Sequence, residues 1–322
     1  AIPTAVCQPT SIAPTIDDDD DDWADQGADD FYKDDYADFA SSENDGDDPE
    51  QHESHNYAGQ KKDDLRRGLT LCQRKGGKRR RRLVEFCTSS ESRLGKMAPP
   101  NCEVIRFTID DDLTSADGLL RAIAAVSDPE CQALLFGALP CTGGSQWQNI
   151  NWHRGPDTQD KIRVHWDVFE MLFCNFVKVA AACSQNGGHV AIEWPRACAY
   201  WSRPEVLRFL RLHTLVDYDF DGCMFGLCST AGVPIKKRWR IASNLPEFSN
   251  IRLKCTHQPS EHAPCAGADT RASEGYTDAL ATSIHACFAL HGRSSSPTGV
   301  EPTLEEFRHE VNLLSFRFLG QK

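Results

Sequence analysis

Long apolar runs are missing from this chain of 322 residues, although 40% of its residues are hydrophobic. No stretch approaches the roughly 20 consecutive apolar residues that a membrane-spanning helix needs, which excludes a membrane-spanning protein. Residues 1–16 lack the basic start and the apolar stretch of a secretory signal. We therefore expect a nuclear or cytoplasmic protein that is not secreted. The first residue is Ala rather than Met, so the chain is a candidate fragment of a longer product.

Regular cysteine spacing is also missing. The 14 cysteines are scattered singly along the chain, next to strand-like and helix-like segments. Disulfide scaffolds are typical of short secreted chains with closely spaced cysteines. The sequence therefore predicts reduced thiols rather than a disulfide framework.

Basic residues are nearly absent from the first 53 residues, which hold 18 Asp and Glu against one Lys. The whole chain carries a net charge of −12 and this segment carries −17, so the remaining 269 residues carry +5. Because an acidic segment repels itself and has little apolar surface to bury, we expect residues 1–60 to be disordered. Aromatic residues interrupt the acidic runs, which leaves contact with a basic partner open.

The charge reverses over residues 61–82, where Lys and Arg are crowded and only Asp63 and Asp64 oppose them. Such a run suits a nuclear-import signal or an arm that contacts the phosphates of DNA. A plain linker, or a segment that folds back on the acidic tail, fits the same composition. These interpretations stay open at the level of sequence.

Strand-like and helix-like segments alternate from residue 83 onward. The expected strands cover residues 83–87, 104–109, 133–137, 189–193 and 235–244, and the expected helices cover residues 119–126, 163–184 and 206–212. This alternation predicts an α/β domain over residues 83–290, with a mostly parallel sheet and helices on both faces. Such sheets carry their functional loops at the carboxyl ends of the strands.

The end of the chain, residues 291–322, is expected to form a loop and a C-terminal helix. Residues 292–302 are rich in Gly, Ser and Pro, which is typical of a loop. Thr303 and Glu306 have the spacing of a capping box at a helix start. Apolar residues then recur at helical spacing as far as Phe318, a pattern that indicates packing against a core.

Two strand ends carry residues suited to chemistry. The strand over residues 133–137 leads into Pro140 and Cys141, where a thiol at the sheet edge is placed to act as a nucleophile. Gly143 and Gly144 follow, and their flexibility would let the loop close over a ligand. The strand over residues 189–193 ends at Glu193, where partial burial would raise the pKa of the carboxyl and suit it to protonate a ring nitrogen. A buried structural Cys and an ion-paired Glu are the alternatives.

A third strand end is basic. Alternation along residues 235–244 would put Lys237 and Trp239 on one face of the strand, and Arg238 and Arg240 on the other. These cations could contact a phosphate or support a catalytic loop. A solvated sheet edge is the alternative.

Together these segments resemble the DNA cytosine-5 methyltransferase family, particularly its short phage-type members. The resemblance covers about residues 83–290, in the order expected for the family. It is carried by "LVEFCTSSESRLG", similar to the first cofactor motif, "ALPCTGGS", similar to the Pro-Cys loop, "IEWPR", similar to the Glu-Asn-Pro-Arg motif, "KKRWRIASN", similar to the later basic motif, and "SEGYTDALATSIH", similar to the final helix.

The resemblance implies a Rossmann-like fold and transfer of a methyl group from S-adenosylmethionine to carbon 5 of cytosine in DNA. Cys141 would attack carbon 6 of a flipped-out cytosine, Glu193 would hold and protonate nitrogen 3, and Arg240 or Lys237 would support the intermediate. The cofactor contacts that the resemblance implies are Glu85, Pro140, and one of Asp110, Asp111 and Asp112.

The sequence departs from the family pattern at three places. Residues 88–92 replace the glycine-rich loop with Ser, Thr and Glu, Cys87 replaces an aromatic residue, and Trp194 replaces the Asn that follows the family's Glu. These departures keep a second interpretation open. It is a catalytically degenerate protein of the same fold that binds nucleic acid or another partner, encoded by a mobile element.

A separate set of residues suits a metal ion. Cys255, His257, His262 and Cys265 have the spacing C-x-H-x4-H-x2-C. Two thiolates and two imidazoles could hold a structural zinc ion in a tetrahedral site. Alternatively, these residues form a loop that borders the active cleft.

Overall fold

The structure is a computed structural model that describes residues 79–267, 269–270 and 273–291. Three expectations lie outside the described residues. They are the disordered acidic segment over residues 1–60, the basic segment as far as residue 78, and the loop and helix expected after residue 291.

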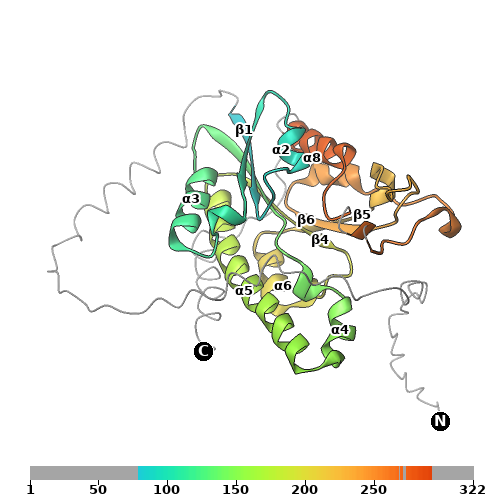
Figure 1. Cartoon of the computed structure of the whole chain (residues 1–322). Helices are drawn as coiled ribbons and strands as arrows, with labels where there is room; N and C mark the ends of the chain where they lie inside the picture. Colours follow the sequence, from blue (N-terminus) through green and yellow to red (C-terminus); the bar gives the residue numbers. More distant parts are fainter. Residues whose placement is uncertain (1–78, 268, 271–272, 292–322) are drawn as a thin grey trace, which may run out of the picture.

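The described chain alternates between strands and helices, as the sequence predicts (Figure 1). In chain order the elements are β1 (Arg80–Phe86), α2 (Arg93–Lys96), β2 (Cys102–Phe107), α3 (Ala116–Val126), β3 (Cys131–Gly137), α4 (Trp147–Asn151), α5 (Pro156–Gln185), β4 (His189–Pro195), α6 (Pro204–Leu212), β5 (Val216–Asp221), β6 (Arg238–Ser243) and α8 (Asp278–Leu290). None of the helices in the described residues is both long and apolar enough to cross a membrane.

The strands form one six-stranded sheet in the order β2-β1-β3-β4-β6-β5. Strand β1 pairs in parallel with β2 and β3, and β3 pairs in parallel with β4. Strand β6 lies between β4 and β5 and runs antiparallel to both. The prediction of an α/β class is therefore confirmed, with a mixed sheet in which β6 is reversed.

Helices cover both faces of the sheet (Figure 1). One apolar cluster joins the sheet to α3, α5 and α6. A second cluster, on the other face, joins the sheet to α2 and α8. Neighbouring residues of β1 show the division, because Leu83 belongs to the second cluster and Val84 to the first. Central strands buried on both faces read as continuous apolar runs, which explains why β1, β3 and β4 are recognisable from sequence.

Local signals set the helix boundaries. Ser115 caps α3 by accepting a hydrogen bond from Gly118 N, and Thr277 caps α8 by accepting one from Leu280 N. Pro156 and Pro204 occupy the first positions of α5 and α6, where their missing N–H costs no helical hydrogen bond. Helix α5 therefore begins seven residues before the expected residue 163.

The basic run contributes to the sheet. Strand β1 begins at Arg80, three residues before the domain boundary expected at residue 83. Arg82 is buried, and its guanidinium pairs with Glu103 at 2.9 Å and Asp128 at 3.0 Å. It also donates a hydrogen bond to Ala125 O at 3.1 Å. The last residues of the expected linker are thus part of the folded domain, because carboxylates from two other segments neutralise this cation.

We predict that Arg82→Ala lowers the free energy of unfolding by about 1–3 kcal/mol, because charged hydrogen bonds are lost and two carboxylates lose their partner. Urea unfolding followed by circular dichroism measures the change. Arg80→Ala is the matched control, since the Arg80 side chain is 71% exposed and lies 3.9 Å from Asp128. It should stay within about 0.5 kcal/mol of the unchanged protein. Equal losses in the two variants would contradict a structural role specific to Arg82.

Candidate functional site

The carboxyl ends of β1 and β3 mark the point where the sheet order reverses. The chain passes from β1 outward to β2, then crosses back to β3 on the other side of β1. Connections to opposite faces diverge at such a point and leave a crevice, which is where open α/β sheets bind ligands. Residues 87–92 follow β1, and residues 138–144, here called the Pro-Cys loop, follow β3. The hydrogen bond from Ala138 N to Phe86 O, at 3.0 Å, joins the two.

The Pro-Cys loop holds Cys141 half-buried, just before a short 3₁₀ turn over Thr142–Gly144. Gly143 and Gly144 are both buried in this turn. A Cβ atom at Gly143 would lie 2.4 Å from Tyr200 Oη, and one at Gly144 would lie 2.7 Å from Cys198 Sγ. These glycines therefore serve close packing rather than the flexible closure that the sequence suggests.

Trp194 anchors the Pro-Cys loop to β4. Its indole is buried, and Nε1 donates a hydrogen bond of 2.8 Å to Leu139 O. Trp194 stands where the family pattern has Asn. In this structure the residue at that position fixes the backbone two residues before Cys141 and packs under α5.

Glu193 is buried at the end of β4, with 8% of its surface exposed. Tyr276 Oη donates a hydrogen bond of 2.7 Å to Glu193 Oε2. The other carboxylate oxygen, Oε1, is buried without a hydrogen-bond partner. Burial raises the pKa of Glu193 to about 7, although the Tyr276 hydrogen bond and the Lys237 charge act in the opposite direction. This carboxyl group can therefore hold or release a proton near neutral pH.

Lys237 approaches the same region just before β6. Its Nζ donates a hydrogen bond of 2.8 Å to Ser273 O and lies 5.4 Å from the centroid of the Trp239 ring. Lys237 and Trp239 thus share a side of the strand, as alternation predicts.

The charges of Glu193 and Lys237 both affect the pKa of the Cys141 thiol. Burial raises the pKa of Cys141 to about 11; the negative charge of Glu193 adds to this effect and the positive charge of Lys237 opposes it. The structure therefore gathers a protonated thiol, an acid with a near-neutral pKa and a lysine at the ends of neighbouring strands. Cys141 also packs against the apolar cluster that joins the sheet to α3, α5 and α6.

Arg240 does not join this group. Its guanidinium pairs with Asp219 at 2.7 Å and with Asp217 at 2.9 Å, and it lies over the Trp201 ring. The two aspartates belong to β5, so Arg240 ties β5 to β6. The sequence left open whether Lys237 or Arg240 lies beside Cys141 and Glu193. Lys237 does, because the carboxylates of β5 already pair with the Arg240 guanidinium.

Glu85 is the second buried carboxylate at this edge. Its Oε1 accepts hydrogen bonds from the hydroxyls of Thr88 and Ser92, and its Oε2 is buried without a partner. Burial raises the pKa of Glu85 against the effect of these hydrogen bonds. Beyond the effect of burial, the negative charge of Glu85, like that of Glu193, raises the pKa of the Tyr276 hydroxyl. Cys87 adopts a left-handed conformation with φ 63°, which a glycine would adopt more easily.

The other residues expected to bind a cofactor differ in their exposure and in whether they already have a partner. Asp111 pairs with Arg121 at 2.7 Å, and Asp112 accepts a hydrogen bond of 2.6 Å from the Thr114 hydroxyl. Asp110 is exposed and Pro140 is half-buried. Asp110 is therefore the best placed of the three aspartates for contact with a molecule in solution.

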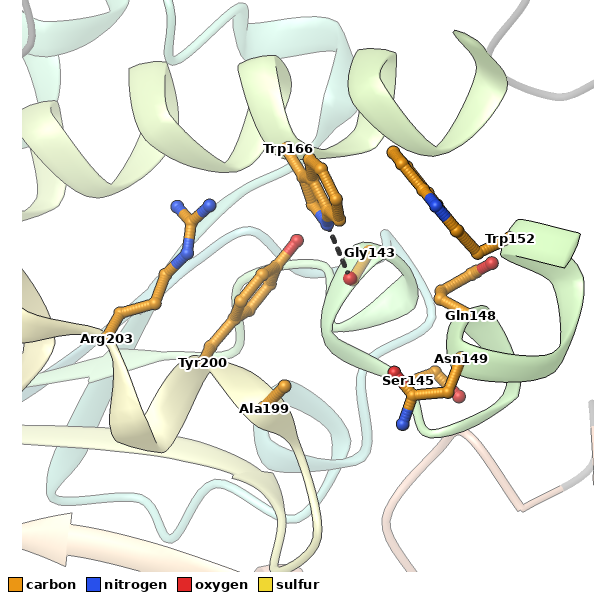
Figure 2. Close-up of a pocket in the computed structure, with 9 residues that line it drawn as sticks. All are labelled: Gly143, Ser145, Gln148, Asn149, Trp152, Trp166, Ala199, Tyr200 and Arg203. Atoms are coloured by element: carbon orange, nitrogen blue, oxygen red, sulfur yellow. Dashed lines mark hydrogen bonds between the residues drawn. The ribbon is translucent and has the colours of Figure 1, made fainter. Parts of the chain in front are cut away.

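An aromatic pocket of about 260 Å³ lies on the other side of the Pro-Cys loop (Figure 2). Trp166 from α5 donates a hydrogen bond of 2.7 Å to Gly143 O, and Tyr200 points toward the same loop. Trp152 stacks on Trp166 with ring centroids 5.5 Å apart, and Arg203 lies over Tyr200. Sequence reasoning identified the loop but missed this pocket, because its walls come from segments that are distant along the chain.

Three of the four residues proposed for zinc come together. Cys255 Sγ lies 3.3 Å from His257 Nδ1 and 3.2 Å from His262 Nε2. Cys265 turns away, with its Sγ 3.1 Å from Ser273 Oγ. Cys223, which follows β5, takes the fourth place. The cysteines of the described residues are free thiols, in line with the expectation of a reduced protein.

Comparison with protein-family models, with curated proteins and with solved structures found no match for this chain. The site is therefore interpreted from its own geometry.

We predict that charges around Cys141 control its rate of alkylation by iodoacetamide at about pH 8.5, where Glu193 is ionised. Glu193→Gln removes a negative charge that raises the thiol pKa, so alkylation should be faster. Lys237→Met removes a positive charge that lowers this pKa, so alkylation should be slower. Peptide mass spectrometry measures each rate, with exposed Cys228 and buried Cys183 as internal references. Unchanged rates at Cys141 in both variants would place these charges outside its environment.

Proposed function

We propose that this protein is a DNA methyltransferase that transfers a methyl group to carbon 5 of cytosine, with Cys141 as the nucleophile. The observation that carries the proposal is the convergence of Cys141, Glu193 and Lys237 at the ends of β3, β4 and β6. A thiol for carbon 6, an acid for nitrogen 3 and a cation for the developing charge are the groups this reaction needs.

The fold supports the same proposal. We infer that the domain is a Rossmann-like methyltransferase domain in which residues 87–92 border the cofactor site and the Pro-Cys loop borders the substrate site. The order reversal between β1 and β3 and the helices on both faces support this interpretation. The reversed strand β6 distinguishes the sheet from a fully parallel doubly wound sheet.

In the proposed reaction, the Cys141 thiol would give its proton to solvent water, and the resulting thiolate would form a bond to carbon 6 of cytosine. Protonated Glu193 gives its proton to nitrogen 3, so the electron pair displaced from the ring collects at carbon 5 rather than on the nitrogen. That pair would form the new carbon–methyl bond, while the sulfur–methyl bond of the donor would break and leave its electron pair on the sulfur as a neutral thioether. Loss of the carbon 5 proton to a water molecule would then release Cys141, while the nitrogen 3 proton would return to Glu193. Lys237 stabilises negative charge on these groups throughout.

S-adenosylmethionine, when bound, supplies the methyl group. Glu85 fits this cofactor, because its buried and unpartnered Oε2 is an acceptor suited to a cationic amine or a hydroxyl. Exposed Asp110, in the 3₁₀ turn Ile109–Asp111 just after β2, suits a ribose hydroxyl. Ser92 and Thr88 fix the orientation of the Glu85 carboxyl through its other oxygen.

In this proposal, basic side chains and aromatic rings would make the contacts to DNA. The Lys and Arg residues over 61–79, which precede β1, could neutralise phosphates without sequence preference. The aromatic pocket beside the Pro-Cys loop offers the rings of Trp152 and Trp166 near the proposed nucleophile, whereas its Arg203 is already paired with Glu170 and Glu205. Base–aromatic stacking and cationic contacts are the usual means of binding an unpaired base.

A second function is favoured by the bond between Tyr276 and Glu193. The Tyr276 hydroxyl already holds one of the two Glu193 carboxylate oxygens, Oε2, and the Cys141 thiol is protonated at neutral pH. Both features suit a catalytically degenerate protein of this fold that binds nucleic acid without methylating it. The two functions differ in cofactor binding and in the need for Cys141.

We predict methyl transfer from radiolabelled S-adenosylmethionine to cytosine-containing duplex DNA, measured as label retained on the DNA. Cys141→Ser should abolish transfer, because the hydroxyl is a far weaker nucleophile. Glu193→Gln should lower the rate by about 10²–10⁴-fold, the usual contribution of a general acid. Cys174→Ser, on α5 and outside the three converging groups, is the control and should keep full activity.

A duplex that contains 5-fluorocytosine sharpens this test, because fluorine cannot leave carbon 5 as a proton does and the enzyme–DNA bond then persists. The unchanged protein should form a covalent adduct at Cys141 that survives denaturing electrophoresis. Calorimetry without detectable S-adenosylmethionine binding, together with retained DNA binding in Cys141→Ser, would reject the enzyme and support the second function.

A further inference from the structure

Four metal-ligating side chains meet beyond the end of β5, away from the proposed catalytic groups. The ligand atoms of Cys223, Cys255, His257 and His262 all lie within 4.8 Å of one another. We refer to these residues as the Cys/His cluster. Cys223 belongs to the 3₁₀ turn Gly222–Phe225, and the other three residues lie in the segment that follows β6.

The two sulfur–nitrogen spacings around Cys255 match a tetrahedral metal site. Zinc binds thiolate sulfur at about 2.3 Å and imidazole nitrogen at about 2.0–2.1 Å, so a sulfur and a nitrogen on one tetrahedral ion lie about 3.5 Å apart. Cys255 Sγ lies 3.3 Å from His257 Nδ1 and 3.2 Å from His262 Nε2. The His257 and His262 rings are nearly perpendicular, with centroids 5.4 Å apart, so they approach from different directions.

The surrounding residues hold Cys255 in position. Asp221, buried at the end of β5, accepts a hydrogen bond of 2.7 Å from Cys255 N. The Asp221 N–H in turn donates to Leu253 O at 3.0 Å. Such contacts from the second layer around a metal orient its ligands.

We propose that the Cys/His cluster binds one structural zinc ion with all four residues as ligands. Two thiolates and two imidazoles favour zinc over the hard cations calcium and magnesium, which prefer oxygen ligands. Four protein ligands complete the tetrahedron and leave no position for a reacting water, so the site is structural rather than catalytic.

The zinc ion would fasten the segment over residues 252–265 to the end of β5. This segment also bonds through Ala263 N to Pro234 O, at 2.8 Å, just before β6. From there the chain leads to Ser273, which accepts the Lys237 hydrogen bond, and to Tyr276, which holds Glu193. The metal would thereby stabilise the approach of Tyr276 and Ser273 to the sheet edge, whatever reaction that edge supports.

The test is the zinc content of the full chain, produced with zinc in the medium, freed of loosely bound metal and measured by inductively coupled plasma mass spectrometry. We expect about one zinc ion per chain. His257→Ala is the most informative variant, because His257 is exposed and its loss leaves the core unchanged. It should lower the zinc content severalfold, as should Cys223→Ser.

Cys265→Ser is the matched control, since Cys265 lies nearby and has the same chemistry but contacts Ser273. It should keep the full zinc content. Cobalt added to the metal-free chain should give the visible absorption of a tetrahedral thiolate site, which His257→Ala should weaken. A chain without zinc or cobalt binding, a disulfide between Cys223 and Cys255 in its place, or equal loss of metal in Cys265→Ser would overturn the proposal. These readouts do not involve methyl transfer, so they stand or fall separately from the proposed function.

Discussion

The burial of the Glu193 carboxyl against Tyr276 is the interaction on which the rest of the site depends. A carboxylate so deeply buried with one unpartnered oxygen is costly when charged, and this cost brings its pKa near neutrality. The same group raises the pKa of the Cys141 thiol and attracts the Lys237 charge. Tyr276 reaches it from just before α8, so the packing of that helix on the sheet positions the partner of the acid.

Much of the fold follows from patterns that a sequence displays. Strands β1, β3 and β4 are apolar along their whole length because helices cover both of their faces, and helix α3 lies where it is expected. Strand β5 was not predicted, because Asp217 and Asp219 interrupt its apolar residues. Their partner is Arg240 on β6, and only the folded sheet brings it to them. The early start of β1 escaped prediction for the same reason, since Arg82 is stabilised by carboxylates from other segments.

The site was partly predictable. Position at a strand end identified Cys141 and Glu193, because parallel strands deliver their carboxyl ends to one edge, whereas Glu85 was indicated only by the family resemblance. Sequence spacing could not reveal that Tyr276 would bond to Glu193, since the two residues are far apart along the chain. Spacing also favoured Cys265 as a metal ligand, whereas Cys223 meets Cys255 because the turn after β5 packs against the later segment. Interactions across the sheet, rather than local pattern, decided these outcomes.

The pH dependence of unfolding in the unchanged protein and in Glu193→Gln tests the central claim most directly. Glu193 has a pKa near 4.5 when exposed and about 7 in the folded protein, so the folded state holds an extra proton between these values. The stability of the unchanged protein should therefore fall relative to the variant as pH rises through this window, by up to about 3 kcal/mol, and level off above it. Parallel stability profiles from about pH 4.5 to 8 would contradict a buried, near-neutral Glu193.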